Sequence, residues 1–365
     1  MNSSSKRRRL NNYCIEDKDI DNFNEDYRTD HDNKFMILHK PMVFTFKGTI
    51  FHNSYIIGSG SFSRVYKVID NKNPNDNTKA LAIKIFKSLT LYKDSAIKEI
   101  NALRKLKECP FIIDIVIYFK ITNNHIAIVT PFYDLNLLNY MERYLEKSII
   151  SRKNFVIVFK SLLNAILFMI KNEISSTDMK PENIFLNVRM DGTIETVVLG
   201  DFSSPLNLNN KIKSYNPWRY TKYYRPPEII FQFQKENLKL MDLWSLGCVL
   251  YELHYYTQKI DHNSILFECD PRDNDLDKSN KNLFRKQSSI LSIPPYSFLE
   301  KYKIEYCAED IYINSSEYKR FKEPNKDIIN DFSNIPFGSE LIVKFLNWDP
   351  DERPSPDYCL EYIEK

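Results

Sequence analysis

The first residues that could do chemistry form a glycine-containing segment, Gly58-Ser59-Gly60-Ser61, after the β-rich residues 55–57. Glycine lets a backbone approach phosphate groups closely and present N–H donors to them. The chain holds only 7 glycines in 365 residues, so this pair indicates a backbone requirement. A plain hairpin turn is the alternative. Because Val65 then opens a strand rather than a helix, a dinucleotide-binding Rossmann fold is disfavoured.

A lysine and a glutamate further along could act on the same phosphates. On a strand predicted over 81–86, Ala82 and Lys84 share one face, since side chains alternate along a strand. Ala82 could border a flat adenine ring, and Lys84 could reach the phosphates of that nucleotide. Glu99, on a helix predicted over about 93–108, could pair with Lys84 and hold it there. Taken singly, Lys84 is more commonly a surface lysine, and Glu99 could equally lie on a solvated helix face.

The densest set of chemical groups is the run Asp178-Met179-Lys180-Pro181-Glu182-Asn183, followed by Asp201-Phe202-Ser203. Asp178 can accept a proton from an incoming hydroxyl, and Lys180 can neutralise a transferring phosphoryl group. Asn183 and Asp201 offer hard oxygen ligands for Mg²⁺. The residue types therefore suit phosphoryl transfer.

This run resembles the catalytic loop of protein kinases, and Asp201-Phe202-Ser203 is similar to their Asp-Phe-Gly motif. Residues 224–228 (Tyr-Arg-Pro-Pro-Glu) are similar to the end of the kinase activation segment. The run that begins at Asp242 resembles the central helix of the large lobe, whose aspartate caps the catalytic-loop backbone. Arg353 matches the family arginine that pairs with the glutamate at Glu228. The resemblance covers about residue 45 to the C-terminus.

The resemblance implies an α+β, two-lobe fold with a small β-rich lobe and a large helical lobe. It implies ATP and Mg²⁺ as cofactors, and transfer of the γ-phosphate to Ser or Thr hydroxyls of protein substrates, with Asp178 as base. Lys84, Glu99 and Lys180 complete the catalytic set, and Asn183 and Asp201 bind the metal. The nucleotide-binding positions carried over are Ile57, Gly58, Ser59, Gly60, Ser61, Val65, Ala82, Lys84, Thr130 (the gatekeeper) and Phe132 (in the hinge).

Two features of the resemblance refine the kind of kinase. Lys180, two residues after the base, follows the pattern of Ser/Thr kinases. Tyr224-Arg225 before Pro226-Pro227-Glu228 looks like the CMGC group, which holds cyclin-dependent, MAP, DYRK-like and CLK-like kinases. The long stretch over about 255–336 fits the insert that this group carries in its large lobe.

The elements that must position these groups divide the chain into three parts. Residues 1–40 are polar and predicted to be a disordered tail with a basic cluster, Lys6-Arg7-Arg8-Arg9. Residues 41–133 are β-rich and predicted as the small lobe and hinge, with strands also expected over 112–119 and 125–129. Residues 134–365 are predicted as the helical lobe, with helices over 155–170 and 242–254 and after Pro356.

Composition narrows the partners and the compartment. The net charge of +3 predicts neither a nucleic-acid nor a membrane partner, whereas a regulatory protein partner stays open. The six cysteines are scattered without metal-ligand spacing, which favours reduced thiols in an intracellular protein. The apolar residues 155–170 look too short and too polar to span a bilayer and are predicted to be a buried helix. The basic cluster Lys6–Arg9 indicates either a nuclear address or a solvated charge run.

The chain departs from the kinase pattern at several positions. Ser176-Thr177 stands where the family has His-Arg, and that arginine meets a phosphorylated residue of the activation segment. Asn216 and Trp218 fall where relatives often place a phosphorylatable Thr or Tyr. These changes suggest a kinase that does not use conventional activation-segment phosphorylation. Ser63 and Ser203 replace family glycines and reduce backbone freedom.

Two other functions compete with an active protein kinase. The first is a pseudokinase that acts as a nucleotide-binding scaffold or regulator, which the changes at Ser176-Thr177 favour. The presence of all five groups that handle ATP, metal and proton weighs against it: Lys84, Glu99, Asp178, Asn183 and Asp201. The second is a small-molecule phosphotransferase. The full-length segment over 201–228 argues for a protein substrate instead, because that segment forms the peptide platform in the family.

Overall fold

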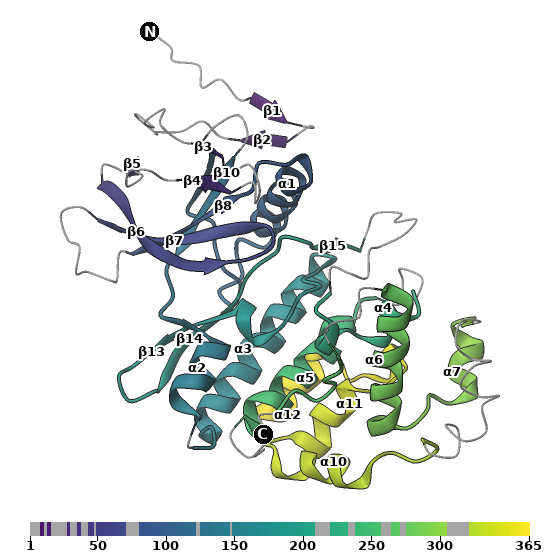
Figure 1. The fold of residues 1–365 in the computed structure, drawn as a ribbon. Coiled ribbons are helices and arrows are strands. Elements are labelled where there is room, and N and C mark those ends of the chain that lie inside the picture. The colour runs from purple at the N-terminus through teal and green to yellow at the C-terminus, as the bar shows by residue number, and fades with distance from the viewer. Residues whose placement is uncertain are drawn as a thin grey trace. The chain divides into compact units, whose positions relative to one another are not determined.

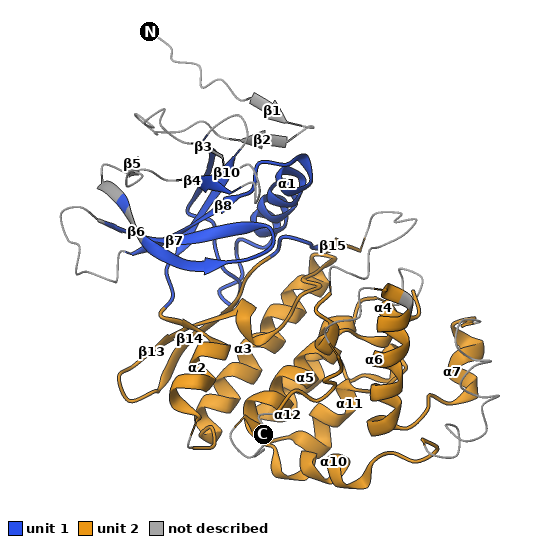
Figure 2. Cartoon of the chain, viewed as in Figure 1, with its two compact units in different colours: residues 1–133, 202–205 blue, residues 134–201, 206–365 orange. Residues whose placement is uncertain are grey.

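The chain forms two compact units in the computed structural model, Met1–Tyr133 with Phe202–Pro205 and Asp134–Asp201 with Leu206–Lys365 (Figure 2). The first unit is built on an antiparallel sheet and the second is mainly helical, so the predicted α+β class is confirmed. The structure describes residues 8–10, 13–15, 28–29, 35–37, 43–46, 49–70, 80–121, 125–146, 148–208, 220–232, 238–256, 264–270, 275–304 and 321–365.

The first unit contains a six-stranded sheet of order β5-β6-β7-β8-β10-β9 and one long helix (Figure 1). Every neighbouring pair in this sheet is antiparallel. The elements are β5 (Val43–Phe46), β6 (Thr49–Ser59), β7 (Ser63–Asp70), β8 (Leu81–Phe86), α1 (Thr90–Lys105), β9 (Ile117–Lys120) and β10 (Ile126–Pro131).

The two faces of this sheet carry separate apolar clusters. One face buries Val68, Ile83 and Val129 together with neighbours from β9. The other face packs Phe86 and Ile128 against the apolar side of α1, which contributes residues such as Ala96, Ile97 and Ile100. Helix α1 therefore lies on the same face of the sheet as the even-numbered residues of β8, because side chains alternate along a strand.

The predicted strand over 112–119 is shorter in the structure and begins at Ile117. The Ile112 amide instead donates to the Cys109 carbonyl in a turn, which takes these residues out of the sheet. In the predicted tail, short strands pair as β1 (Arg8–Leu10) with β2 (Tyr13–Ile15), and β3 (Arg28–Thr29) with β4 (Met36–Ile37). Lys6 and Arg7 of the basic cluster lie outside the described residues, so the tail and its nuclear address stay predictions.

The second unit is organised around α5, in which every residue from Met241 to Tyr255 is buried. Helix α3 packs against α5, α12 and β14. The helices are α2 (Leu137–Tyr144), α3 (Arg152–Lys171), α4 (Pro227–Ile230), α5 (Met241–Tyr255), α6 (Leu276–Leu291), α7 (Tyr296–Lys301), α10 (Lys326–Asp331), α11 (Val343–Phe345) and α12 (Pro356–Glu364). The strands are β11 (Leu135–Asn136), β12 (Ile174–Ser175), β13 (Ile184–Val188), β14 (Ile194–Leu199) and β15 (Leu206–Asn207).

Helix α3 has 20 residues and is long and apolar enough, by length and composition, to cross a membrane. The expectation that this stretch is too short and too polar is therefore wrong, because the helix begins at Arg152, where Ser151 caps it, and continues to Lys171. Its apolar side chains are nevertheless buried within the unit, with Phe159 and Leu162 fully inaccessible. This burial matches the predicted core helix.

Candidate functional site

Lys84 and Glu99 form a close ion pair in the first unit. The Lys84 ammonium donates to both carboxylate oxygens of Glu99, at 2.9 and 2.7 Å. Only 14% of the lysine side chain and 4% of the glutamate side chain are exposed. The pairing arises because α1 packs on the face of β8 that carries Lys84. In so little solvent the pair holds the lysine in one place more firmly than a surface ion pair would.

The strand register gathers other predicted nucleotide-binding residues on the Lys84 face of the sheet. Val65 of β7 lies opposite Gly58 on β6 and opposite Lys84 on β8. Ala82 of β8 lies opposite Thr130 on β10. Residues directly opposite one another in an antiparallel pair point to the same face. The backbone amide of Phe132 donates to the carbonyl of Ala80 just beyond this row. Ile57, Ser59, Gly60 and Ser61 are exposed at the end of β6 and in the following turn.

The glycine-containing turn is closed by a hydrogen bond from the Gly60 amide to the Ser63 carbonyl at 2.9 Å. Gly58 and Gly60 both lack a positive φ, and a Cβ on Gly60 would meet nothing within 4 Å. The backbone here does not itself require glycine, so the open space above Gly60 is the notable feature. Ser63 and Ser203 also avoid the left-handed region, so neither serine strains the backbone in this state.

In the second unit, Asp178 is surrounded by hydrogen-bond donors. Its Oδ2 accepts from the Asn183 amide and lies 3.0 Å from the Lys180 ammonium. Its Oδ1 accepts from the Thr221 hydroxyl at 2.6 Å and from the Thr221 backbone N–H at 3.3 Å. Lys180 also donates to the Thr221 hydroxyl at 2.9 Å. This arrangement holds the carboxyl group of Asp178 in one orientation.

Thr221 is the site residue that the sequence analysis did not assign to catalysis. It lies far along the chain from Asp178, and no local pattern signals the contact. Asn216 and Trp218, which the sequence analysis placed at positions often phosphorylated in relatives, lie outside the described residues.

The electrostatic surroundings keep Lys180 charged. Burial alone would lower the pKa of its ammonium group, but the charge and hydrogen bond of Asp178 and the charges of Glu182 and Asp201 outweigh burial and raise it. A positive charge is therefore held beside the proton-accepting carboxylate. This pairing can stabilise negative charge that develops next to Asp178.

Two of the backbone positions around the loop are strained. Thr177 has φ of 65° and Asp201 has φ of 55°, in the left-handed region that non-glycine residues seldom occupy. Thr177 directly precedes Asp178, the predicted base, and Asp201 is one of the two predicted metal ligands. Such outliers persist where the surrounding contacts over-determine them, and they concentrate at functional sites.

Buried contacts from α5 hold the start of this loop. Asp242 accepts from the Ser176 amide at 3.3 Å and from the Ser176 hydroxyl at 3.1 Å. Burial raises the pKa of Asp242, whereas hydrogen bonds from Ser175, Ser176 and Thr177 work against that rise. The expected capping by Asp242 is present, and the serine that replaces the family histidine adds a side-chain bond to it.

The expected partner of Glu228 is also present. Arg353 donates from Nη1 and Nη2 to the two Glu228 carboxylate oxygens at 2.6 and 2.8 Å, and neither side chain is exposed. Arg225 is buried as well, but it donates to Asn280 Oδ1 at 2.6 Å and to the Tyr220 carbonyl at 2.9 Å. Among the described residues no carboxylate forms an ion pair with Arg225, and burial lowers its pKa to about 10.

The donor set fits a magnesium ion held partly by a nucleotide. The Asn183 amide nitrogen donates to the Asp178 carbonyl and carboxylate, which leaves its Oδ1 for a cation. The Gly200 amide donates to the Asn183 carbonyl and so ties Asp201 to this loop. In the described parts of the chain, no group of three or more His, Cys, Asp or Glu side chains is arranged so that it could hold a metal ion by itself. Two protein oxygens suit Mg²⁺, which commonly takes its remaining ligands from phosphates and water.

Comparison with known proteins supports the same chemistry. The family model described as "Protein kinase domain" matches residues 51–363. The chain is 26% identical over 347 residues to "Dual specificity tyrosine-phosphorylation-regulated kinase 2" of Drosophila melanogaster, covering 91% of this chain and 43% of that protein. It is 30% identical over 307 residues to "MAPK/MAK/MRK overlapping kinase" of Mus musculus, covering 84% and 65%. It is 27% identical over 329 residues to "Sporulation protein kinase mde3" of Schizosaccharomyces pombe, covering 86% and 55%. The chain thus spans less than two thirds of each of these relatives.

Proposed function

The chain belongs to the protein kinase domain family, and on that premise we propose that it transfers the γ-phosphate of ATP to serine or threonine hydroxyls of protein substrates. The observation that carries this proposal is the Asp178–Lys180–Thr221 network. It places the carboxyl group of Asp178 beside the ammonium group of Lys180. The names of the relatives support phosphoryl transfer to proteins, and the Ser/Thr preference rests on Lys180, as the resemblance implies.

Each group then has a defined role. ATP supplies the phosphoryl group, and Lys84, fixed by Glu99, binds phosphate oxygens. Asn183 and Asp201 would hold Mg²⁺, which when bound would supply positive charge against the phosphates. Asp178 takes the proton from the attacking hydroxyl, and Lys180 stabilises the negative charge on the transferred group.

The CMGC group is our proposed subgroup. Tyr224-Arg225 before the Pro-Pro-Glu run supports it, as do the DYRK and MAK names among the relatives.

We also propose that the activity is controlled without phosphorylation of the activation segment. Thr177 offers no positive charge for a phosphate, and Ser176 is held by Asp242. Phosphatase treatment of active protein should leave its rate unchanged. Loss of activity together with loss of phosphate from Ser214 or Tyr215 would contradict this.

A nucleotide-binding scaffold without transferase activity is the alternative, favoured by Ser176-Thr177 in place of His-Arg. A radiometric phosphotransfer assay on a Ser/Thr peptide array decides between the two. We expect transfer by the wild-type chain, and at least about a 100-fold lower rate for Asp178→Asn and for Lys84→Met. ATP binding measured in parallel by calorimetry identifies a scaffold, which would bind ATP without transferring phosphate.

A further inference from the structure

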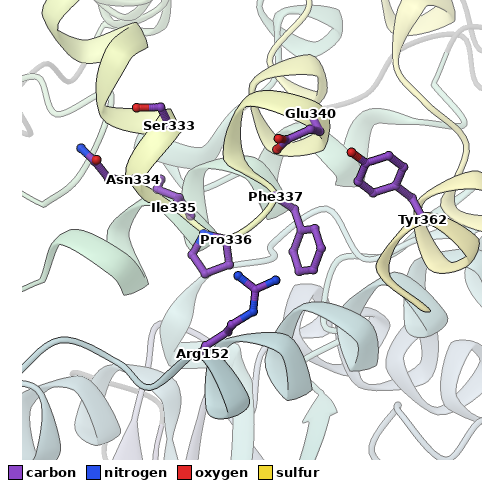
Figure 3. A pocket seen from close by; sticks show the side chains of 8 residues that line it. All are labelled: Arg152, Ser333, Asn334, Ile335, Pro336, Phe337, Glu340 and Tyr362. Carbon is purple, nitrogen blue, oxygen red and sulfur yellow. The ribbon is translucent and has the colours of Figure 1, made fainter. Parts of the chain in front are cut away.

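A second concave site lies in the helical unit, and it shares no residue with the candidate catalytic site. It is a pocket of about 380 Å³ (Figure 3). This volume falls within the range of roughly 300–1,000 Å³ that is typical of ligand pockets. Its lining comes from the start of α3, the turn between α10 and α11, and the end of α12, and consists of Arg152, Ser333, Asn334, Ile335, Pro336, Phe337, Glu340 and Tyr362.

The wall of the pocket is built on strained backbone. Phe337 has φ of 61°, which is an outlier for a bulky residue. A Cβ on the next residue, Gly338, would lie 1.8 Å from the Phe332 carbonyl oxygen, so glycine is required there. A π-helical turn, Gly338–Ile342, then follows. Strained residues and π-turns both concentrate at functional sites.

The Phe337 ring is held by aromatic and cationic neighbours. The Arg152 guanidinium lies 5.1 Å from the ring centroid. Phe159 packs at 6.3 Å from behind, in the core, and the Tyr362 ring lies edge-on at 6.4 Å. In Figure 3 the Arg152 guanidinium points toward Pro336 and Phe337. The pocket therefore offers a preformed apolar surface beside a positive charge.

Two opposite charges, Arg152 and Glu340, lie on the rim of the pocket. Arg152 and Glu340 are both exposed, and neither forms an ion pair with any described residue. Five of the eight lining residues are exposed, which makes the pocket shallow and open: Arg152, Ser333, Asn334, Glu340 and Tyr362. Exposed ion pairs contribute little affinity by themselves, so a small charged molecule would bind weakly here. A chain segment that also covers the aromatic wall gains apolar contact and orientation.

We infer that this pocket docks a short segment of a partner protein, in which an aromatic or other apolar side chain packs on Phe337 and Tyr362. An acidic residue of that segment pairs with Arg152, and a basic residue pairs with Glu340. Even weak docking becomes effective when the partner is also engaged elsewhere on the chain, because the second contact raises the local concentration. The inference concerns binding and holds whether or not the chain transfers phosphate.

The test uses the full chain and an array of fluorescent octapeptides. Each peptide carries one Glu, one Phe and one Lys in every order and spacing on a Gly/Ser background, and binding is read by fluorescence polarisation. A subset should bind, and Arg152→Glu should weaken those peptides at least tenfold. The double variant Arg152→Glu/Glu340→Lys should bind peptides with Glu and Lys exchanged, and lose the original ones.

Arg143→Glu is the matched control, since Arg143 is also exposed and lies 5.4 Å from the ring of Tyr144 outside the pocket. It should leave peptide binding unchanged, and all variants should phosphorylate a short peptide lacking the docking residues at the wild-type rate. The inference is overturned if no array peptide binds, if charge reversal at Arg152 has no effect, or if the double variant does not exchange the preference. These outcomes are independent of whether the wild type is active.

Discussion

Three side chains converge on the carboxylate of Asp178, and the one that lies farthest along the chain, Thr221, bonds to both the carboxylate and the Lys180 ammonium. Its hydroxyl bridges the two charges and fixes the distance between them. A phosphate on this hydroxyl would place about two negative charges against Asp178. At the residue scale, Thr221 is therefore a positioning group and unsuited to activation by phosphorylation.

Substitution of Thr221 tests this role. Thr221→Val keeps the shape of the side chain but removes the hydroxyl, so we expect kcat to fall about 10- to 100-fold, since a hydrogen bond to a charged group contributes about 1.5–3 kcal/mol. Thr221→Ser, which keeps the hydroxyl, is the control and should retain most activity. Steady-state kinetics with a peptide substrate measure both. Equal activity of the Val and Ser variants would rule the role out.

Gly60 and Gly192 form a matched pair for a second prediction. Gly60→Ala should change the free energy of unfolding by less than about 0.5 kcal/mol, because the added Cβ meets nothing and φ is not positive. It should nevertheless raise the KM for ATP, because the methyl group obstructs the approach of phosphates.

Gly192→Ala should destabilise the chain by more than about 1 kcal/mol, since φ is 81° and Tyr144 Cδ1 lies 2.9 Å from the new Cβ. ATP affinity should not change in that variant. A Gly60→Ala protein with unaltered KM would remove this turn from the nucleotide site.

At the scale of elements, the position of α1 on the sheet decides whether Glu99 can form its ion pair with Lys84. The helix presents Ala96, Ile97 and Ile100 to Phe86 and Ile128, and this packing orients Glu99 toward β8. The Lys84–Glu99 ion pair therefore depends on how α1 packs against the sheet. A sheet that lost this helix would leave Lys84 without its carboxylate.

A double-mutant cycle measures that coupling. Because Glu99 is almost fully buried, Glu99→Gln should lower the free energy of unfolding by about 3 kcal/mol, and Lys84→Met by a similar amount. The double variant should cost much less than the sum, since it leaves no uncompensated charge. Glu108→Gln, at an exposed acid just beyond α1, is the control and should change stability little. Additive costs in urea titrations would show that the two groups are energetically independent.

At the scale of the whole molecule, the helical unit contains a buried acid whose ionisation opposes folding. Burial raises the pKa of Glu252 to about 7, although a hydrogen bond from the Tyr224 hydroxyl at 2.6 Å works against the rise. Its ordinary value is 4.5, so between pH 4.5 and about 7 the folded state binds more protons than the unfolded state. The free energy of unfolding therefore falls as pH rises through this window and levels off above it.

Glu252→Gln removes this dependence. Relative to the wild type, the variant should gain on the order of 2 kcal/mol in unfolding free energy between pH 5 and pH 8. Glu300→Gln, at an exposed acid in α7, should show no such gain. Urea titrations at the two pH values measure the difference. A constant difference between variant and wild type would place the ionisation of Glu252 outside this range.

The sequence by itself determined the fold class and the kinase family. The run from Asp178 to Asn183 carries the predicted base, a lysine and a predicted metal ligand within a few residues of one another, and covalent connection alone keeps such groups close. A β-rich apolar run located β8, and the apolar stretch over 242–254 located α5; the structure packs apolar clusters on both faces of the sheet and buries α5 along its whole length. The pairing of Lys84 with Glu99 was predicted from the two residues and their elements, and that of Glu228 with Arg353 through family resemblance.

Tertiary structure decided what no local pattern encodes. It brought Thr221 to Asp178, added a hydrogen bond from the Ser176 hydroxyl to the expected Asp242 cap, and raised the pKa of Glu252. It also assembled a pocket from Arg152, Phe337 and Tyr362, which belong to separate elements. Proximity between distant segments depends on how whole elements pack, and a pKa depends on the burial that this packing creates. For this reason the candidate catalytic groups and the two ion pairs could be predicted from the sequence, whereas the contact of Thr221 with Asp178 and the pocket around Phe337 could not.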